Sequence, residues 1–142
     1  MKISAKTEYA CIAMLELAER YGSGEPVRIR EIADEHGVPA RFLVQILLQL
    51  KGAGFVASTR GASGGYQLVR PPERISLGEV MSVIEGADEP IASSASPESQ
   101  WGKVLQAAWQ EVADVERRAL QAITFADLVE RAKRRTENMY YI

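Results

Sequence analysis

Apolar residues recur every three or four positions in several stretches of the chain, the spacing of one buried face of an α-helix. The first stretch follows Ser4, a residue type that caps helix starts, and ends at "YGSGEP". Two more stretches, "VRIREIADEHG" and "ARFLVQILLQLKGAG", meet near Gly37, where a left-handed turn is expected. Small Ala33, flexible Gly37 and apolar Leu43 would let these two helices cross closely. This part of the chain therefore predicts a helix-turn-helix whose second helix begins at Pro39.

Two short stretches after this helix pair have the character of β-strands. "FVAST" and "YQLV" flank the glycine-rich turn "RGASGG", as in a β-hairpin. A hairpin directly after a helix-turn-helix is the arrangement of a winged helix, and this combination is more specific than either half. A further helix is predicted from Ser76 to about Gly86, because apolar residues again recur at helical spacing.

The second half of the chain contains a loop and a long helix. The segment "ADEPIASSASPESQ" is rich in Ser, Pro and Ala and has no apolar periodicity, so it predicts a flexible loop of sensor type. Apolar residues then alternate steps of four and three, the heptad spacing of a helix that packs along a partner helix. The predicted seam consists of Trp101, Leu105, Ala108, Val112, Val115 and Ala119. This helix could fold back on its own domain, but its small contact residues favour close packing against a second copy.

A last helix is predicted over "ITFADLVERAKRRTE". The expected fold class is therefore mainly α with a small β-hairpin, as a winged helix-turn-helix plus a long C-terminal dimerisation helix. We expect the winged-helix domain with its N-terminal helix over 1–86, the flexible loop over 87–100, and the dimerisation and C-terminal helices over 101–142.

Composition limits the remaining possibilities. A length of 142 residues with 46% hydrophobic content fits one globular domain with a helical arm. No apolar run approaches the roughly 20 residues of a membrane-spanning helix, so we expect a cytoplasmic protein without membrane contact. Cys11 is the only cysteine, which excludes an internal disulfide, and with the single His36 it offers few ligands for a conventional zinc site. We therefore expect no metal site, with Cys11 as a packing residue and His36 as a helix-end residue.

The net charge of −2 hides an uneven distribution along the chain. Between His36 and Pro72 there is no Asp or Glu at all. The basic residues of this stretch are Arg41, Lys51, Arg60 and Arg70. Cationic side chains without neighbouring carboxylates create a positive surface region, which indicates a phosphate-rich partner such as DNA.

If the partner is duplex DNA, the predicted second helix of the helix-turn-helix and the glycine-rich turn would contact different grooves. The helix that begins at Pro39 would enter the major groove, where Arg41 can pair with guanine and Gln45 with adenine. The thin glycine-rich tip would bring Arg60 into the narrow and strongly negative minor groove. Two copies joined through the heptad helix would require an imperfectly palindromic operator.

Five segments of the sequence resemble the Rrf2 family of bacterial winged-helix transcription regulators. They are "KISAKTEYACIAMLELA", "IADEHGVPARFLVQILLQLKGAGFV", "RGASGGYQL", "ISLGEVMSVIEG" and "ITFADL", and the resemblance spans residues 1–132. It implies a homodimeric, sequence-specific regulator that acts as a repressor on double-stranded DNA. The DNA contacts expected on this basis are Lys6, Pro39, Arg41, Phe42, Gln45, Arg60, Gly61, Ser63 and Gly64.

The loop before the heptad helix departs from this family's pattern. Members of the family often sense cellular state through an iron–sulfur cluster held by three cysteines in that loop. The loop of this chain contains Ser93, Ser94, Ser96 and Ser99 but no cysteine, and hydroxyls are poor ligands for such a cluster. The chain as written is therefore expected to hold no cluster. Two explanations stay open: a natural member that senses another small-molecule or redox signal, or a natural cluster protein whose loop cysteines have been exchanged for serine.

Two other classes of function compete with this interpretation. A winged helix can also serve as a protein-interaction adaptor without DNA binding, although the acid-free stretch argues against that role. An enzyme is the weakest possibility, because one His and one Cys provide no evident pair of nucleophile and base.

Overall fold

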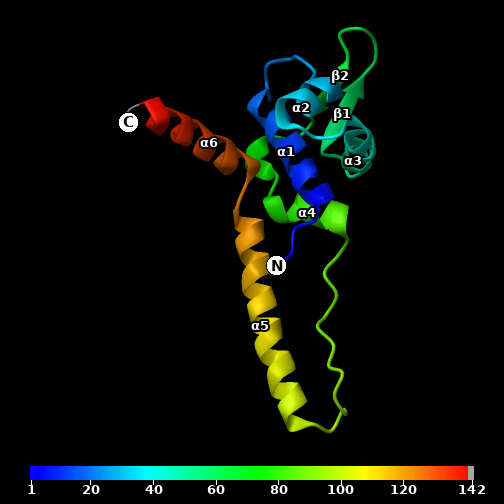
Figure 1. The fold of residues 1–142 in the computed structure, drawn as a ribbon, viewed down its shortest axis with the longest axis vertical. Helices are drawn as coiled ribbons and strands as arrows, with labels where there is room; N and C mark the ends of the chain where they lie inside the picture. Colours follow the sequence, from blue (N-terminus) through cyan, green and yellow to red (C-terminus); the bar gives the residue numbers. More distant parts are fainter. Residues whose placement is uncertain (141–142) are drawn as a thin grey trace.

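The computed structural model describes residues 1–140 of the chain. Its elements in chain order are α1 (Ala5–Glu19), α2 (Ile29–His36), α3 (Ala40–Gly52), β1 (Val56–Thr59), β2 (Gly65–Leu68), the 3-10 helix η1 (Pro72–Arg74), α4 (Leu77–Glu85), α5 (Gln100–Ala122) and α6 (Phe125–Tyr140). Figure 1 shows a bundle of short helices with the hairpin at one end and α5 projecting from the other. The prediction of a mainly helical winged helix-turn-helix with a long C-terminal helix is confirmed. Residues 141 and 142 of the predicted C-terminal part lie outside the described residues.

The helix ends follow from local chemistry that the sequence already indicated. The Ser4 side chain caps α1 by accepting a hydrogen bond from the backbone N–H of Thr7. Gly37 ends α2 with φ of 66°, a left-handed conformation that glycine adopts without strain. Pro39 differs from the prediction, because its ψ of 126° leaves it outside α3 as the N-cap. Its carbonyl accepts from the N–H of Phe42, so the helix begins one residue later, at Ala40.

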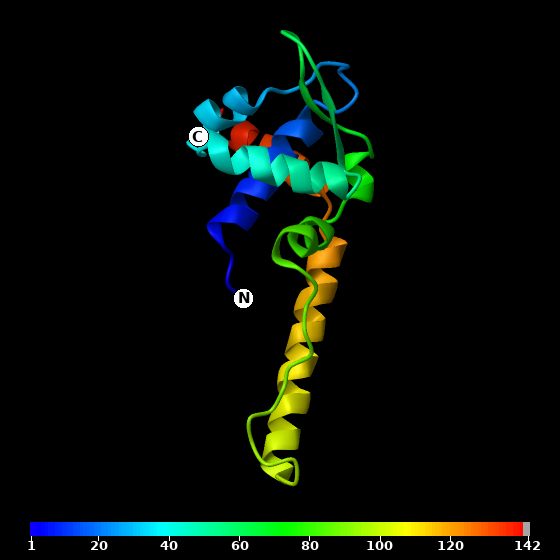
Figure 2. The same cartoon turned by 90° about the vertical axis from the view of Figure 1, so that its right-hand side faces the viewer.

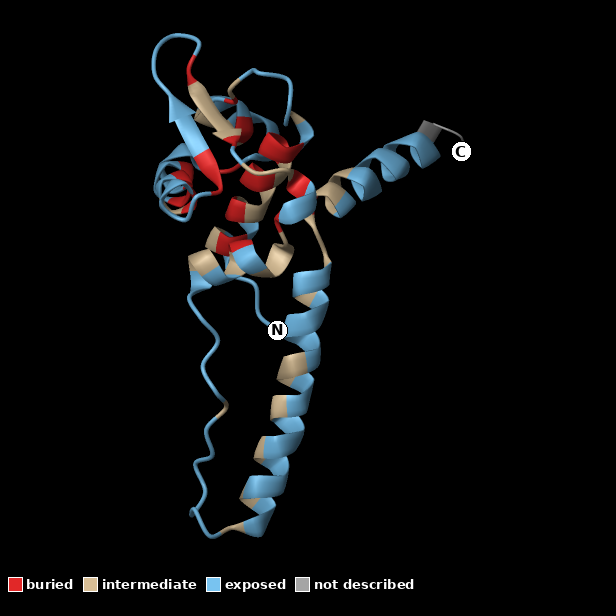
Figure 3. Cartoon of the chain, turned by 180° about the vertical axis from the view of Figure 1, so that it is seen from behind, coloured by how far each residue is buried: buried red, intermediate tan, exposed pale blue. Residues whose placement is uncertain are grey.

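One hydrophobic core is formed by the four helices α1, α2, α3 and α4 together with the hairpin and the start of α6. Its largest fully buried side chains include Met14, Leu17, Ile32, Leu43, Ile46, Leu47, Leu50, Ile75 and Phe125. Burial of each such side chain stabilises the fold by about 1.5–3 kcal/mol relative to exposure. The buried positions in Figure 3 accordingly cluster in the helical bundle beside the hairpin, whereas α5 shows only exposed and intermediate positions.

Both strands of the hairpin contact the helices, β1 against α3 and β2 against α1. Strands β1 and β2 pair antiparallel, with Val56 opposite Leu68 and Thr59 opposite Gly65. Val27, in the connection before α2, forms an isolated bridge with Tyr66 through backbone hydrogen bonds of 2.9 and 2.8 Å. Because Tyr66 is only the second residue of β2 after the turn, these bonds hold the hairpin close to its tip, and residues 60–63 of the tip stay exposed beyond them.

The C-terminal half leaves the bundle and then returns to it. Residues 87–99 form neither helix nor strand and run beside α5, where the carbonyl of Ile91 accepts from the side-chain amide of Gln106 at 2.6 Å (Figure 2). After α5 the chain rejoins the domain, since the N–H of Phe125 donates to the carbonyl of Ile75 at 3.0 Å. From there α6 packs against α1. No helix within 1–140 combines the length and the apolar character that a bilayer crossing requires.

Candidate nucleic-acid interface

Helix α3 has one face in the core and the opposite face in solvent. Leu43, Ile46, Leu47 and Leu50 are fully buried. Arg41 and Gln45 are exposed, and so is Pro39 at the N-cap. The apolar face therefore fixes the rotation of the helix, and this rotation directs the predicted DNA-contacting side chains outward.

Phe42 links the exposed face of α3 to α1. Its ring lies 6.0 Å from the ring of Tyr9, at an interplanar angle of 45°. The guanidinium carbon of Arg41 lies 5.2 Å from the centre of the same ring, a distance at which a cation–π attraction holds the side chain. Phe42 thus positions Arg41, in addition to being itself exposed.

The tip of the hairpin places Arg60 in solvent, and the glycines after it make the turn possible. Gly61 has φ of 103°, a conformation that side chains disfavour, and its carbonyl accepts from the N–H of Gly64 at 3.0 Å. Gly64 is buried, and a Cβ at this position would overlap the carbonyl oxygen of Thr59. Gly64 therefore gives the turn its shape, while Arg60, Gly61 and Ser63 form its exposed surface.

Lys6 lies in the first turn of α1, half-buried. The hydroxyls of Ser4 and Thr7 donate to the carboxylate of Glu85 at the end of α4. These hydrogen bonds lower the pKa of Glu85, and the nearby charge of Lys6 lowers it further. The start of α1 is therefore tied to α4, and part of the Lys6 charge faces a carboxylate.

Arg70 does not belong to the open positive surface that the sequence suggested. Its guanidinium lies 4.5 Å from the centre of the Phe55 ring and 3.4 Å from a carboxylate oxygen of Glu79. The acid-free stretch could not reveal this pairing, because Glu79 comes from α4. Among the described residues of the stretch, Arg41, Lys51 and Arg60 are the cations on the exposed side, with Lys51 donating to Ser58.

Two apolar residues on the exposed face of α3 were not predicted as part of the site. Val44 and Leu48 are both exposed although they lie in a helix rich in buried leucine. They flank Gln45 and follow Arg41 by three and seven residues, so they share its side of the helix. Apolar side chains in this position can contact the methyl group of thymine. The sequence contained a signal for this, because Val44 and Leu48 do not fall at the three- and four-residue spacing of the buried residues of α3.

The donor groups of the loop before α5 do not fit an iron–sulfur cluster. Ser93 and Ser96 accept hydrogen bonds from backbone N–H groups two residues later, and Ser99 caps α5 by accepting from the N–H of Gly102. Ser94 is exposed. Such a cluster needs thiolates, whereas Cys11 lies on α1, where burial raises the pKa of its thiol to about 11.

The predicted dimerisation seam is an exposed apolar stripe in the single chain. No residue of α5 is buried, Trp101 is 81% exposed and Val112 is 66% exposed. The other predicted seam residues, Leu105, Ala108, Val115 and Ala119, are exposed as well. Val104 and Trp109 widen the stripe on either side. The alternative that α5 folds back on its own domain is wrong for the described residues, since the helix projects from the bundle (Figure 1).

Comparison with known proteins agrees with this architecture. A family model described as an iron-dependent transcriptional regulator, Rrf2, matches residues 3–131. The HTH-type transcriptional regulator CymR of Bacillus subtilis is 34% identical over 128 residues, which cover 90% of this chain and 89% of CymR.

Solved structures give the same result. The structure of CymR (YrzC), described as the global cysteine regulator of B. subtilis, matches with a TM-score of 0.81 at 31% identity, covering 92% of this chain and 97% of that chain. The structure of T. potens IscR matches with a TM-score of 0.76 at 32% identity, covering 93% of this chain and 88% of that chain. The family consists of DNA-binding transcription regulators and not of enzymes. On this evidence the chain belongs to the Rrf2 family of transcriptional regulators.

Proposed function

We propose that the protein is a homodimeric, sequence-specific repressor that reads duplex DNA with α3 in the major groove and Arg60 in the minor groove. The observation that supports this most directly is the position of the two basic contact regions, which are the exposed face of α3 with Arg41 and the hairpin tip with Arg60. Helix α3 and the hairpin pack against each other, and both come from the stretch of 37–71 that contains no carboxylate (Figure 1). A duplex can approach this side without meeting negative charge from that stretch.

In the major groove, α3 offers two kinds of contact. Arg41 and Gln45 have hydrogen-bond donors that match guanine and adenine edges. Val44 and Leu48 lie on the same side and suit thymine methyl groups, so we infer a mixed readout of polar and apolar base edges. The N-terminal end of α3 contains no acidic residue, which also suits its approach to phosphate.

The hairpin supplies the second contact. Its tip has small residues on both sides of the turn, and β2 is held close to the turn by the bridge between Val27 and Tyr66. A guanidinium on such a tip can enter a minor groove, most favourably one narrowed by A·T base pairs. Salt should weaken binding steeply, because condensed counterions return to the phosphates.

Dimerisation through α5 would complete the DNA-binding unit. The apolar stripe from Trp101 to Ala119 follows the heptad positions and is exposed in the single chain. A two-fold axis along α5 would present two copies of α3 and of the hairpin, which requires an operator with two related half-sites.

The substitution Arg60→Ala tests the minor-groove contact. Binding to duplex DNA from upstream of the protein's own gene should weaken by about 10- to 100-fold, the range of one lost base-edge contact. Arg135→Ala is the matched control, because it removes the same charge from the exposed far part of α6. Equal affinities of the Arg60→Ala variant and the parent chain in a titration by fluorescence anisotropy would contradict the proposed role of the hairpin.

We also propose that the effector of this chain is not sensed through an iron–sulfur cluster. The loop serines form local turns and a helix cap, and thiolates are missing from 87–100. Anaerobic reconstitution with iron and sulfide should therefore leave no visible charge-transfer absorption on the protein. Stoichiometric iron and sulfide with such absorption would contradict this proposal.

A further inference from the structure

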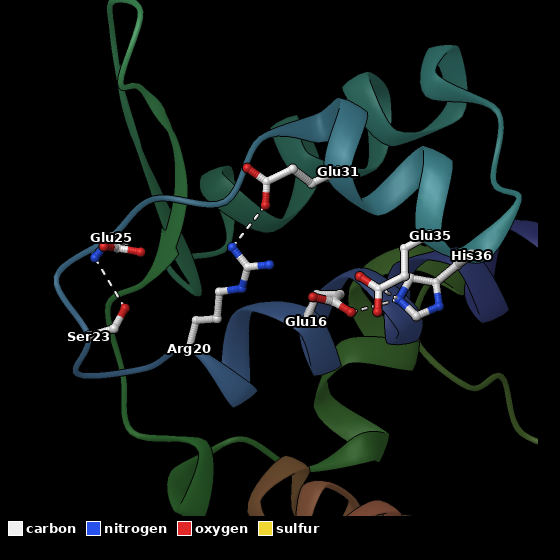
Figure 4. Close-up of polar contacts among 7 residues, drawn as sticks. All are labelled: Glu16, Arg20, Ser23, Glu25, Glu31, Glu35 and His36. Carbon is white, nitrogen blue, oxygen red and sulfur yellow. Dashed lines mark hydrogen bonds and ion pairs between the residues drawn. The ribbon is translucent and has the colours of Figure 1, made fainter.

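A cluster of two carboxylates and one imidazole lies where α1 packs against the end of α2. Glu16 comes from α1, and Glu35 and His36 are the last two residues of α2. Each offers one ligand atom, and these atoms lie within 4.8 Å of one another. Figure 4 shows the carboxylates of Glu16 and Glu35 beside the imidazole ring of His36.

Glu16 is the least expected member of this cluster. It is only 6% exposed, and a buried carboxylate is unfavourable unless a cation or strong hydrogen bonds compensate it. Within the described part of the chain its hydrogen-bond partner is the Nε2 atom of His36, at 2.7 Å from Oε1. Arg20, the C-cap residue of α1, points instead to Glu31, with 2.8 Å between nitrogen and oxygen (Figure 4).

His36 is placed between two acidic groups. Its Nε2 atom faces Oε1 of Glu16 at 2.7 Å and Oε2 of Glu35 at 3.9 Å. The His36 side chain is 32% exposed, and Glu35 lies in solvent, so the open side of the cluster is accessible to water. One neutral imidazole nitrogen and two carboxylate oxygens form a ligand set that suits Zn²⁺ or Fe²⁺.

We propose that Glu16, Glu35 and His36 form a binding site for a single divalent transition-metal ion of this class. The ion would take the place of the proton between His36 and Glu16, since the coordinating nitrogen must be unprotonated. Two ligands at the usual metal distances are about 3.3 Å apart across a tetrahedral ion. The separation between Nε2 and Oε1 therefore has to open by about 0.6 Å from its present value. Water would complete the coordination on the exposed side.

A neighbouring cavity gives an ion and its water ligands a path to the cluster. The cavity, of about 670 Å³, lies between α1, α2 and α6 and is lined by all three cluster residues. Apolar side chains, among them Ile12, Leu15 and Val129, form much of its wall. Apolar side chains on one side lower the local dielectric constant, which strengthens the attraction between a bound cation and the carboxylates.

The site would connect metal binding to the helix-turn-helix, the unit proposed to contact DNA. His36 directly precedes Gly37, the left-handed residue of the turn between α2 and α3. An ion held jointly by α1 and α2 would fix the end of α2 and with it the entry into α3. The single histidine, expected from the sequence to be only a helix-end residue, would then be a ligand.

Calorimetric titration of the full, untagged chain with ZnCl₂, and absorption spectroscopy with Co²⁺, test the proposal. We expect one ion per chain, and the visible bands of tetrahedral Co²⁺ without the strong near-ultraviolet absorption of a thiolate ligand. His36→Gln and Glu35→Gln should each weaken binding at least about tenfold, since even outer partners of a metal site contribute that much. Both residues are solvent-accessible, and the glutamine introduced by His36→Gln can still donate an amide N–H to Glu16, so these variants should stay folded.

Asp34→Asn is the matched control, because Asp34 is an exposed acid on the same helix outside the cluster. Zn²⁺ should raise the melting temperature of the parent chain and of this control, but not of the His36→Gln variant. Absence of Zn²⁺ binding to the parent chain would overturn the proposal, as would His36→Gln and Glu35→Gln variants that bind Zn²⁺ as tightly as the parent chain. Either result would leave the proposed DNA binding untouched, because that is measured with Arg60→Ala.

Discussion

The substitution Val112→Ala tests the dimer seam at its centre. It removes two methyl groups that are 66% exposed in the single chain and would be buried between two copies of α5. Each buried carbon stabilises an interface by about 0.8 kcal/mol, and two-fold symmetry applies the loss in both chains. Scaled by the present exposure, the loss is about 2 kcal/mol, which corresponds to an increase of about 30-fold in the dimer dissociation constant.

Sedimentation equilibrium at several concentrations measures this constant directly. Alanine is a better helix former than valine, so weaker association could not be attributed to a weaker α5. Gln121→Ala serves as the control, because Gln121 is an uncharged, exposed residue of α5 outside the heptad seam, and its loss should leave the dissociation constant unchanged. A monomeric parent chain, or a Val112→Ala dimer as strong as the parent dimer, would refute the reasoning.

Three further substitutions or measurements address the hairpin, the core and α1. Gly64→Ala should reduce operator affinity at least several-fold, because the added Cβ would overlap the carbonyl oxygen of Thr59. Ala62→Gly, at the exposed tip, is the control and should have little effect. Titration by fluorescence anisotropy compares the DNA affinities of the two variants. Phe125→Ala should lower the free energy of unfolding by about 3–5 kcal/mol in urea denaturation, and a loss below about 1 kcal/mol would show that the start of α6 is not part of the core. The Cys11 thiol, with its pKa raised from 9.0 to about 11, should react with iodoacetamide at pH 8 about 100-fold more slowly in the folded than in the unfolded chain. The folded chain favours the protonated thiol, so the contribution of Cys11 to the free energy of unfolding is fully present below pH 9 and is lost as the pH rises toward about 11. Urea denaturation at several pH values across that range can check this.

The helix-turn-helix and the hairpin could be predicted from the sequence because their signals are local. The cap at Ser4, the left-handed Gly37 and the two short strands around the glycines depend on residues within a few positions of each other. Local steric and hydrogen-bonding preferences are decided by such neighbours. The heptad spacing of α5 is likewise a property of the sequence, and the exposed stripe follows it.

The charge surface could only be judged in three dimensions. The sequence shows four basic residues without an acidic neighbour, but Arg70 forms an ion pair with Glu79 from a later helix and lies over the ring of Phe55. The exposed Val44 and Leu48 became part of the candidate site only when the rotation of α3 was known. Long-range pairing of this kind depends on how the elements pack, which no spacing along the chain encodes.

The acid–imidazole cluster is the clearest case of this difference. Glu16 and His36 are 20 residues apart, and neither belongs to a metal-binding motif. The sequence by itself determined which segments are helices and which face of each is apolar. Tertiary packing alone decided that a buried carboxylate on α1 meets the histidine at the end of α2, because only the crossing of two helices brings such distant side chains within bonding distance.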